Sequence, residues 1–258
     1  MMILFVVGFV FLHMCCVWFW YRYTQNPSVV DVGWASGLTL SGLIYLFSQN
    51  FSVRACVLSL VLIFWGLRLG LFLWLTRVRQ GKIDKRYLVL SDGWKIAKPL
   101  GFFLNFQLQG ILICIISLPW YFTSLVNNSL NFSDVLALSC AILAICLEMT
   151  ADLQLQNFKR QYPGMVCNRG LWYYSRHPNY FFEWLVWCAF TVFALRSAWG
   201  WLAIISPVTL YWMMTRVTGP MTEQGSLKSR GQMYLDYQTV TPMFFPKFVK
   251  FVKSYEKN

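Results

Sequence analysis

The sequence contains few charged residues. Only 12% of its 258 residues are Asp, Glu, Lys or Arg, about half the fraction that a soluble domain of this length carries. Hydrophobic residues make up 57% of the chain and aromatic residues 19%. A helix that crosses a bilayer needs roughly 20 mostly apolar residues, and several stretches meet this requirement in close succession. The composition excludes an ordinary soluble domain and predicts a polytopic membrane protein.

Patterns for metal ions and disulfides are also missing. The eight cysteines are scattered, almost all within apolar runs, and no CxxC or Cys/His cluster occurs. Of the two histidines, His13 lies in an apolar stretch and is expected to be a packing residue. Neither a disulfide framework nor a zinc site is indicated, and we predict no metal site.

The apolar stretches predict an all-α integral membrane protein, a bundle of seven transmembrane helices forming one domain over residues 1–258. The first stretch lacks the basic start and the cleavage site of a signal peptide, so we interpret it as a span. The predicted spans are 2–22, 29–48, 53–76, 99–122, 133–158, 179–196 and 198–217.

The basic residues predict the orientation of these spans. Lys and Arg are concentrated in segments 77–98 and 159–178 and in the tail, whereas the opposite face has only Arg54 and Arg196. Basic loops face the cytoplasm, which places the N-terminus outside and the C-terminus in the cytoplasm. The net charge of +12 therefore reflects topology and attraction to anionic lipid, with a bound anion as a second interpretation. Nucleic acid is not a predicted partner.

Nine polar residues within the predicted spans fall in the cytoplasmic half. Charged groups inside a membrane are costly and usually mark a functional site. Interhelical hydrogen bonding would explain any single amide, but convergence at one depth predicts a cytoplasm-facing pocket. The residues concerned are Asp31, Arg68, Asn105, Gln109, Glu148, Asp152, Gln156, Asn179 and Glu183.

Residues 168–183, with the sequence NRGLWYYSRHPNYFFE, combine a basic loop with a helix start. Pro178 favours the first helical turn and disfavours helix at His177. Arg176 and His177 therefore precede a helix N-terminus, whose free amides suit a phosphate. Arg176 is able to hold such a group through two hydrogen bonds, and His177 to contact a phosphate or an adenine ring.

The run G-L-W-x-Y-S-R-H-P-N-Y-x-x-E resembles the C-terminal signature of the steroid 5-alpha-reductase (3-oxo-5-alpha-steroid 4-dehydrogenase) family, particularly its bacterial members. The resemblance covers nearly the whole chain, whereas the shorter R-H-P-x-Y also occurs in membrane methyltransferases of the isoprenylcysteine carboxyl type. Further matches to the family are Asp31-Val32-Gly33-Trp34, Arg68-Leu69-Gly70, Asp84-Lys85-Arg86-Tyr87, Glu148-x-x-x-Asp152, Phe158-Lys159 and Tyr234-x-x-Tyr237.

The resemblance implies seven helices that hold NADPH from the cytosolic side, with a cofactor-binding half of roughly 77–258. It implies reduction of a carbon–carbon double bond conjugated to a ketone in a lipophilic, steroid-like substrate. The cofactor-binding residues implied by the matching motifs and basic loops are Arg77, Arg79, Arg86, Glu148, Asp152, Lys159, Arg169, Arg176, His177, Asn179, Tyr180, Glu183 and Tyr237.

Three residues are candidates for polarising the substrate carbonyl. In the animal enzymes of the family this role belongs to a glutamate of the second helix and a tyrosine of the third. Asp31 is our candidate for the acid, because an apolar surround would keep it protonated. Trp65 occupies the position of the tyrosine, and Tyr87 is the alternative if its loop folds inward.

Two other functions remain open on the sequence. An S-adenosylmethionine-dependent methyltransferase would use the same R-H-P-x-Y helix start, and Glu223 and the tail with Tyr234 and Tyr237 also suit it. The many Arg and Lys side chains suit a polyanionic dinucleotide better. A transporter or lipid-binding protein is favoured by no specific feature. The expected partners are a steroid-like small molecule and membrane lipid. The expected state is a monomer in a bacterial inner membrane, with the cofactor site facing the cytoplasm.

Overall fold

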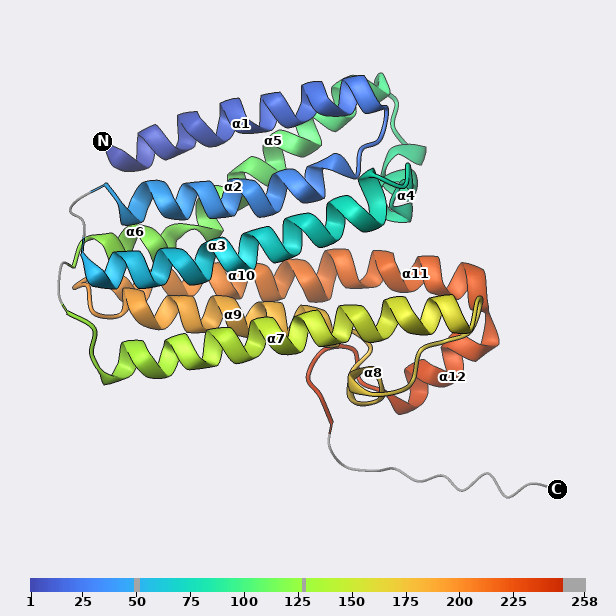
Figure 1. Cartoon of the computed structure of the whole chain (residues 1–258). Coiled ribbons are helices and arrows are strands. Elements are labelled where there is room, and N and C mark those ends of the chain that lie inside the picture. The colour runs from blue at the N-terminus through green and yellow to red at the C-terminus, as the bar shows by residue number, and fades with distance from the viewer. Residues whose placement is uncertain (49–51, 127–128, 248–258) are drawn as a thin grey trace. The chain divides into compact units, whose positions relative to one another are not determined.

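A computed structural model describes residues 1–48, 52–126 and 129–247 (Figure 1). Within these ranges every regular element is a helix and no strand occurs. The prediction of an all-helical protein is confirmed. Three of the basic residues in the predicted cytoplasmic tail, Lys250, Lys253 and Lys257, lie outside the described residues.

Five helical segments are long and apolar enough to cross a membrane. They correspond to the first five predicted spans, which confirms a multi-pass membrane protein. Their bounds are Met2–Thr24, Val29–Leu46, Val53–Val78, Lys98–Ser124 and Phe132–Gln161. The count of seven spans and the orientation of the termini stay predictions.

The last two predicted spans fall on shorter helices. α9 covers Pro178–Ala194 and has 17 residues. The predicted span 198–217 is divided into a 3-10 helix, Gly200–Ile204, the α-helix α10, Ile205–Met213, and a π-helix, Met214–Thr218. A Cβ atom on Gly200 would lie 1.7 Å from the Ala194 carbonyl oxygen, so this glycine permits the tight turn that follows α9.

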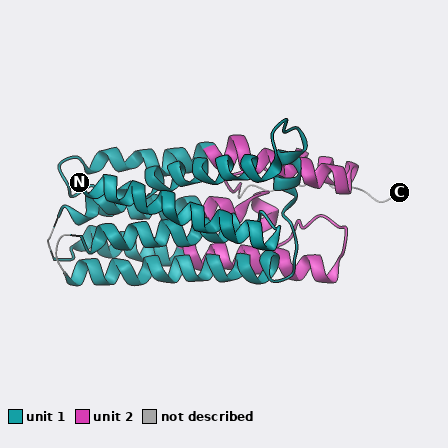
Figure 2. Ribbon diagram, turned by 90° about the horizontal axis from the view of Figure 1, so that it is seen from above, with its two compact units in different colours: residues 1–143, 184–212 teal, residues 144–183, 213–258 magenta. Residues whose placement is uncertain are grey.

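The chain forms two compact units, coloured separately in Figure 2. Unit 1 comprises residues 1–143 and 184–212, and unit 2 comprises residues 144–183 and 213–258. The helices α7, Phe132–Gln161, and α9 each begin in one unit and end in the other. A single domain with a cofactor-binding half of about 77–258 stays a prediction.

In unit 1, α2 (Val29–Leu46) is the most buried of the candidate spans. It packs against α1, α3, α5 and α6, whose bounds are Met2–Thr24, Val53–Leu73, Lys98–Ile116 and Leu118–Ser124 (Figure 1). Glycine allows the closest approach: a Cβ on Gly66 of α3 would lie 1.9 Å from Thr39 Oγ1 on α2. Small residues at helix contacts are a common feature of membrane bundles.

An aromatic cluster fills the core of unit 1. The Trp65 ring meets Trp187 edge to face at 5.5 Å between centroids, and Trp187 in turn meets Phe190 at 5.4 Å. Trp120 packs on Phe190 at 4.4 Å. Edge-to-face and tilted geometries are the preferred arrangements of aromatic pairs, so these four side chains form one continuous contact between helices α3, α6 and α9.

A buried group of three charges lies at the end of unit 1 where α3 begins. The Arg54 guanidinium donates to both carboxylate oxygens of Asp134, at 3.1 and 3.0 Å, and to the carbonyls of Thr123 and Phe193. Arg196 Nη1 is 2.8 Å from the same carboxylate. Arg54 and Asp134 are almost completely buried. The two arginines that the sequence placed on the less basic face are thus both partners of one aspartate.

Unit 2 surrounds the 168–183 motif. It contains α8 (Leu171–Tyr174), α11 (Gly219–Arg230) and α12 (Gln232–Val240), together with the C-terminal part of α7. Trp172 Nε1 donates to the Ala151 carbonyl at 2.8 Å, and Gln154 Oε1 accepts from the Leu171 amide at 2.9 Å. The motif is therefore attached to α7 by hydrogen bonds from residues 171 and 172.

Candidate functional site

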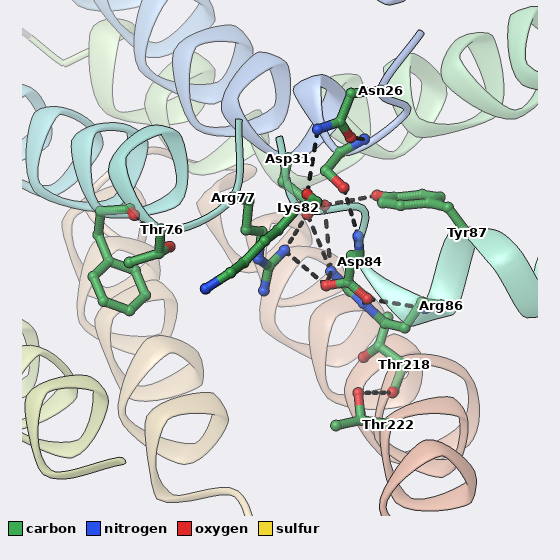
Figure 3. A network of polar contacts seen from close by, with 12 residues as sticks. Asn26, Asp31, Thr76, Arg77, Lys82, Asp84, Arg86, Tyr87, Thr218 and Thr222 are labelled. Atoms are coloured by element: carbon green, nitrogen blue, oxygen red, sulfur yellow. Dashed lines mark hydrogen bonds and ion pairs between the residues drawn. The ribbon is translucent and has the colours of Figure 1, made fainter. Parts of the chain in front are cut away.

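In unit 1, Asp31 is the centre of a polar network shown in Figure 3. The Tyr87 hydroxyl donates to Asp31 Oδ1 at 2.6 Å, Arg86 Nη2 approaches Oδ2 at 3.2 Å, and Arg77 Nη1 also donates to Oδ2. Asp84 binds the same two guanidinium groups, at 3.0 Å from Arg77 and 2.9 Å from Arg86. Two carboxylates and two guanidinium groups therefore form one closed network.

Backbone contacts explain how this loop reaches Asp31. Asp84 is the N-cap of α4, Lys85–Asp92, and its side chain accepts a hydrogen bond from the Arg86 amide at 2.9 Å. The Asp84 amide donates to Ser28 Oγ at 2.8 Å, and Asn26 Nδ2 donates to the Lys82 carbonyl at 3.2 Å. Residues 82–86 are thereby attached to the turn that precedes α2. Such side chain to backbone bonds are typical of Asn, Asp and Ser in turns and caps.

The charged groups of the network shift the pKa values of Asp84 and Tyr87. Burial alone would raise the pKa of Asp84, but the attraction of Arg86 and Arg77 and the hydrogen bonds from Arg86 lower it well below its usual value. Burial and the neighbouring Asp31 carboxylate raise the pKa of Tyr87 far above its usual value. At neutral pH Asp84 is therefore a carboxylate and Tyr87 a phenol that carries its proton.

The expectation of an apolar surround for Asp31 is wrong. Its neighbours are the Arg77 and Arg86 guanidinium groups and the Tyr87 hydroxyl. The Asp31 carboxylate oxygens therefore act here as acceptors of hydrogen bonds. Tyr87 was an alternative only if its loop folds inward. The loop does so, and the Tyr87 side chain is buried beside Asp31.

The other predicted residues of unit 1 have different surroundings. Trp65 is fully buried in the aromatic cluster. Arg79 is exposed and lies over the Trp74 ring at 5.9 Å. Arg77 and Arg86, expected to bind cofactor phosphates, are engaged by Asp31 and Asp84. The structure thus unites Asp31 with Tyr87 and assigns both of these arginines carboxylate partners.

In unit 2, Glu223 joins the two central residues of the motif. Its carboxylate accepts from Arg176 Nε at 2.7 Å and Nη2 at 3.2 Å, and lies 3.2 Å from His177 Nε2. Gln238 Nε2 donates to it at 2.7 Å. Burial alone would raise the pKa of Glu223, but hydrogen bonds from His177 and Arg176 outweigh burial and lower it to about 2. The glutamate is therefore ionised at neutral pH.

The remaining donors of Arg176 also have protein partners. Nη1 donates to the carbonyls of Gln238 at 3.1 Å and Thr241 at 2.7 Å, and its backbone amide to Pro242 at 2.9 Å. In this structure the bidentate partner of Arg176 is Glu223, where the sequence predicted a phosphate. Arg176 consequently attaches the motif to α11, α12 and the segment that follows.

The C-terminal segment continues along the motif. Ser175 Oγ donates to the Phe244 carbonyl at 2.9 Å, and the Lys247 amide donates to the Tyr174 carbonyl at 3.0 Å. Tyr237, predicted to bind the cofactor, donates its hydroxyl to the Trp172 carbonyl. Residues 237–247 therefore have an evident structural role in holding residues 172–176.

The predicted residues nearer to α7 form a second polar group in unit 2. Asn179 Nδ2 donates to Asp152 Oδ1 at 3.1 Å, while Asn179 Oδ1 is buried and has no hydrogen-bond partner. Tyr180 stacks on His177 at 5.0 Å between ring centroids. Glu148, Asp152 and Glu183 are buried, whereas Lys159 and Arg169 are exposed.

The sequence did not identify several partners of the predicted residues. Glu223 was noticed only as suiting a methyltransferase, and Gln238, Thr241 and Asp134 were not singled out. The Tyr234-x-x-Tyr237 match did indicate that the tail belongs with the motif. In the described ranges, no group of three or more His, Cys, Asp or Glu side chains is placed to hold a metal ion.

The long apolar helices define a multi-pass helical membrane protein, which contains one polar group around Asp31 and another around the 168–183 motif. A family described as "Protein of unknown function (DUF1295)" matches residues 17–241. The chain belongs to this family, which is related to steroid 5-alpha-reductase-like membrane proteins.

A relative in fission yeast shows how far the similarity extends. The chain is 25% identical over 259 aligned positions to uncharacterized protein C594.04c of Schizosaccharomyces pombe, and the alignment covers 87% of this chain and 74% of the yeast protein. No solved structure matches the chain.

Proposed function

We propose that the protein is an NADPH-dependent reductase that saturates the carbon–carbon double bond of a conjugated enone in a lipophilic, steroid-like substrate. The hydrogen bond between Tyr87 and Asp31 carries the proposal. It joins a phenol to a carboxylate of the second helix, the two residue types implied by the family resemblance. The relation of the DUF1295 family to steroid 5-alpha-reductase-like proteins supports the same assignment.

The chemistry requires a donor at the carbonyl oxygen of the substrate. When bound, NADPH supplies a hydride to the beta carbon of an enone. Negative charge then develops on the carbonyl oxygen, and a positioned donor lowers the barrier to that change. Tyr87 is the proposed donor, since burial and the Asp31 carboxylate keep its pKa high and its proton in place.

Asp31 takes a different role from the one expected on the sequence. It orients the Tyr87 hydroxyl, which turns to the carbonyl oxygen when the substrate enters. Arg77 and Arg86, both bonded to Asp31, hold its carboxylate in position beside Tyr87. The alpha carbon finally takes a proton from solvent water, and this proton together with the hydride completes the addition of two hydrogens across the double bond.

Unit 2 supplies groups that fit a nucleotide. The unpaired Asn179 Oδ1 is a buried acceptor, and an acceptor of this kind suits the carboxamide or the exocyclic amine of a dinucleotide. Asp152, its neighbour at 3.1 Å, is able to accept from a ribose hydroxyl. The exposed Lys159 and Arg169 are the proposed phosphate partners of this unit.

The proposal includes the finer topology. Seven spans, with the N-terminus outside and the C-terminus in the cytoplasm, place the basic segments 77–98 and 159–178 on the cytoplasmic side. A cofactor site on that side has access to cytosolic NADPH. We further propose a bacterial inner membrane as the location and a monomer as the functional state.

A methyltransferase that uses S-adenosylmethionine is the second candidate, favoured by one observation. Arg176 is bound by Glu223, and unit 2 buries four carboxylic acids, Glu148, Asp152, Glu183 and Glu223. S-adenosylmethionine carries a sulfonium and an ammonium group, for which carboxylates are natural partners. The dinucleotide remains our first choice because the family relation points to reductases.

The deciding experiment is a thermal-shift titration of the detergent-solubilised protein with NADPH, NADH and S-adenosylmethionine. A ligand that binds only the folded protein raises the melting temperature with the logarithm of its concentration above Kd. Stabilisation by NADPH, abolished in Asn179→Ala but kept in the control Asn157→Ala, which changes an exposed residue of α7, supports the reductase. Stabilisation by S-adenosylmethionine alone rejects it in favour of the methyltransferase.

A further inference from the structure

The segment between α3 and α5 carries a surface that the proposed reaction does not use. Its two ends continue directly into candidate membrane spans, Val53–Val78 before it and Lys98–Ser124 after it. Both ends of residues 79–97 are therefore held where helices leave the bilayer. The Trp94 ring packs on Phe102 of α5 at 4.9 Å, and tryptophan is enriched at membrane interfaces.

The short helix in this segment, α4, has two distinct faces. Tyr87 and Ser91, four residues apart, are its buried residues, and Tyr87 contacts the Asp31 network. Leu88 and Val89 face outward and are 52% and 39% exposed. Lys85 shares this outward face, because residues three and four apart on a helix are neighbours.

Exposed apolar and basic side chains continue on both sides of α4. Ile83 precedes the helix and Ile96 follows it, 39% and 45% exposed. The exposed lysines are Lys82, Lys85, Lys95 and Lys98, and the exposed acid among them is Asp92. Arg86 and Asp84 neutralise each other within the network, so these lysines give the surface a clear positive charge.

From this arrangement we propose that residues 82–98 form a docking surface for anionic phospholipids. Leu88, Val89 and the two isoleucines enter the boundary between headgroups and acyl chains, while the four lysines contact the phosphates around them. A basic amphipathic segment with exposed aliphatic side chains binds a membrane surface in this way. The occupant is the anionic leaflet that borders α3 and α5.

Lipid fits this surface better than a soluble phosphate compound. The lysines are distributed along 17 residues and alternate with aliphatic side chains, whereas a site for a small anion needs donors that converge on one point. The Arg77 and Arg86 guanidinium groups, which do converge, are bound to Asp31 and Asp84. The apolar side chains would have no function towards a soluble anion.

The test is native mass spectrometry of the full-length protein in detergent, titrated with phosphatidylglycerol or with phosphatidylcholine of the same acyl chains. We expect phosphatidylglycerol to bind at least tenfold more tightly, because each interfacial lysine contributes roughly fivefold to the affinity for an anionic surface. Lys82→Gln/Lys85→Gln should reduce this preference about tenfold or more. Leu88→Asp should weaken the binding of both lipids.

A matched control removes two exposed basic residues elsewhere. Arg160→Gln/Lys228→Gln should leave the preference for phosphatidylglycerol unchanged, and all variants should keep the wild-type melting temperature within a few degrees. Equal affinity for the two lipids in the wild-type protein would overturn the proposal. So would an equal loss in the control variant, or displacement of phosphatidylglycerol by millimolar pyrophosphate, which would assign the lysines to a soluble phosphate ligand.

Discussion

Tyr87 donates its hydroxyl hydrogen to Asp31 at 2.6 Å, although 56 positions separate the two residues in the sequence. The contact exists because Asp84 begins α4 and binds Ser28 through its backbone amide. These bonds fix the direction in which α4 leaves the loop, and Tyr87 lies on the face of α4 that points inward. A side chain of α4 and one of α2 thereby become hydrogen-bond partners.

Removal of the Tyr87 hydroxyl should abolish reduction while the protein stays folded. In Tyr87→Phe the ring keeps its edge contact with Phe102, at 6.4 Å between centroids. We expect the rate of enone reduction to fall by about 100-fold or more. Stability should decrease by about 1.5–3 kcal/mol, because one hydrogen bond to a charged group is lost. Single-turnover oxidation of NADPH measures the first effect and thermal unfolding the second.

The matched control for this variant is Tyr45→Phe. Tyr45 is also a buried tyrosine of unit 1 and lies at the other end of α2. Its substitution should leave the rate of reduction within about twofold of the wild type. Normal reduction by Tyr87→Phe would exclude this phenol as the donor.

Asp31→Asn should lower the stability of the protein and also the rate of enone reduction. The change leaves Arg77 and Arg86 with Asp84 as their carboxylate partner. Breaking a fully buried ion pair costs about 3–5 kcal/mol, and we expect about 2 kcal/mol here because the Asp31 and Arg86 side chains retain 12% and 20% exposure. The exposed Asp92→Asn, also in this region, should have no measurable effect on the melting temperature.

A double-mutant cycle separates the ion pair from other consequences of Asp31→Asn. Unfolding is measured for Asp31→Asn, Arg86→Gln and the combined variant. Residues in direct contact should show a coupling free energy of about 0.5 kcal/mol or more. Strict additivity would mean that the Asp31–Arg86 contact contributes nothing to stability.

Glu223 should make the stability of the protein depend on pH in the acid range. Its pKa is lowered from 4.5 to about 2 in the folded protein. The ionised form is favoured by folding, so its contribution is complete above about pH 4.5 and is lost as the pH falls towards 2. The difference in melting temperature between wild type and Glu223→Gln should therefore shrink steadily over this interval.

Other groups that titrate at acid pH are present in both proteins and cancel in this comparison. Asp236→Asn, which changes an exposed acid of α12, serves as the control and should follow the wild-type profile. A constant difference between wild type and Glu223→Gln from pH 6 to pH 3 would show that the Arg176 and His177 contacts do not favour the ionised glutamate.

The Arg54–Asp134 pair should be among the most sensitive positions for folding. Both side chains are buried, at 2% and 1% exposure, and removal of one partner leaves an uncompensated charge. Arg54→Gln and Asp134→Asn should each cost about 3–5 kcal/mol. Arg196→Gln provides the comparison: its side chain is 21% exposed, and about 1 kcal/mol is expected. Equal losses in all three variants, measured by thermal unfolding in detergent, would contradict this ranking.

Hydropathy predicted the long helices well because burial in lipid depends on composition alone. The predicted span 133–158 agrees closely with α7, Phe132–Gln161. Breaks were harder to predict, since they depend on neighbours distant in sequence. The turn at Gly200 requires the approach of the Ala194 carbonyl. A local signal did exist at Ser117, where α5 ends two residues before Pro119.

The sequence identified many residues of the two polar groups, but it did not identify the residues to which they are hydrogen-bonded. A motif identifies residues close together in the chain, such as Arg176 and His177, but their carboxylate partner Glu223 lies 47 and 46 positions away. Asp31 was identified from its position in a span, whereas its partners Arg77 and Arg86 come near it only in the folded loop. Asp134 escaped notice because it begins a helix and does not interrupt an apolar run.

The ion pair of Arg54 with Asp134 also has a consequence for biosynthesis. The aspartate is translated 80 residues after the arginine, an interval of about 4–16 s at 5–20 residues per second. An unpaired guanidinium is costly inside a bilayer. We therefore expect the N-terminal end of α3 to stay near the membrane surface until α7 has been synthesised, so that these two helices complete their insertion together.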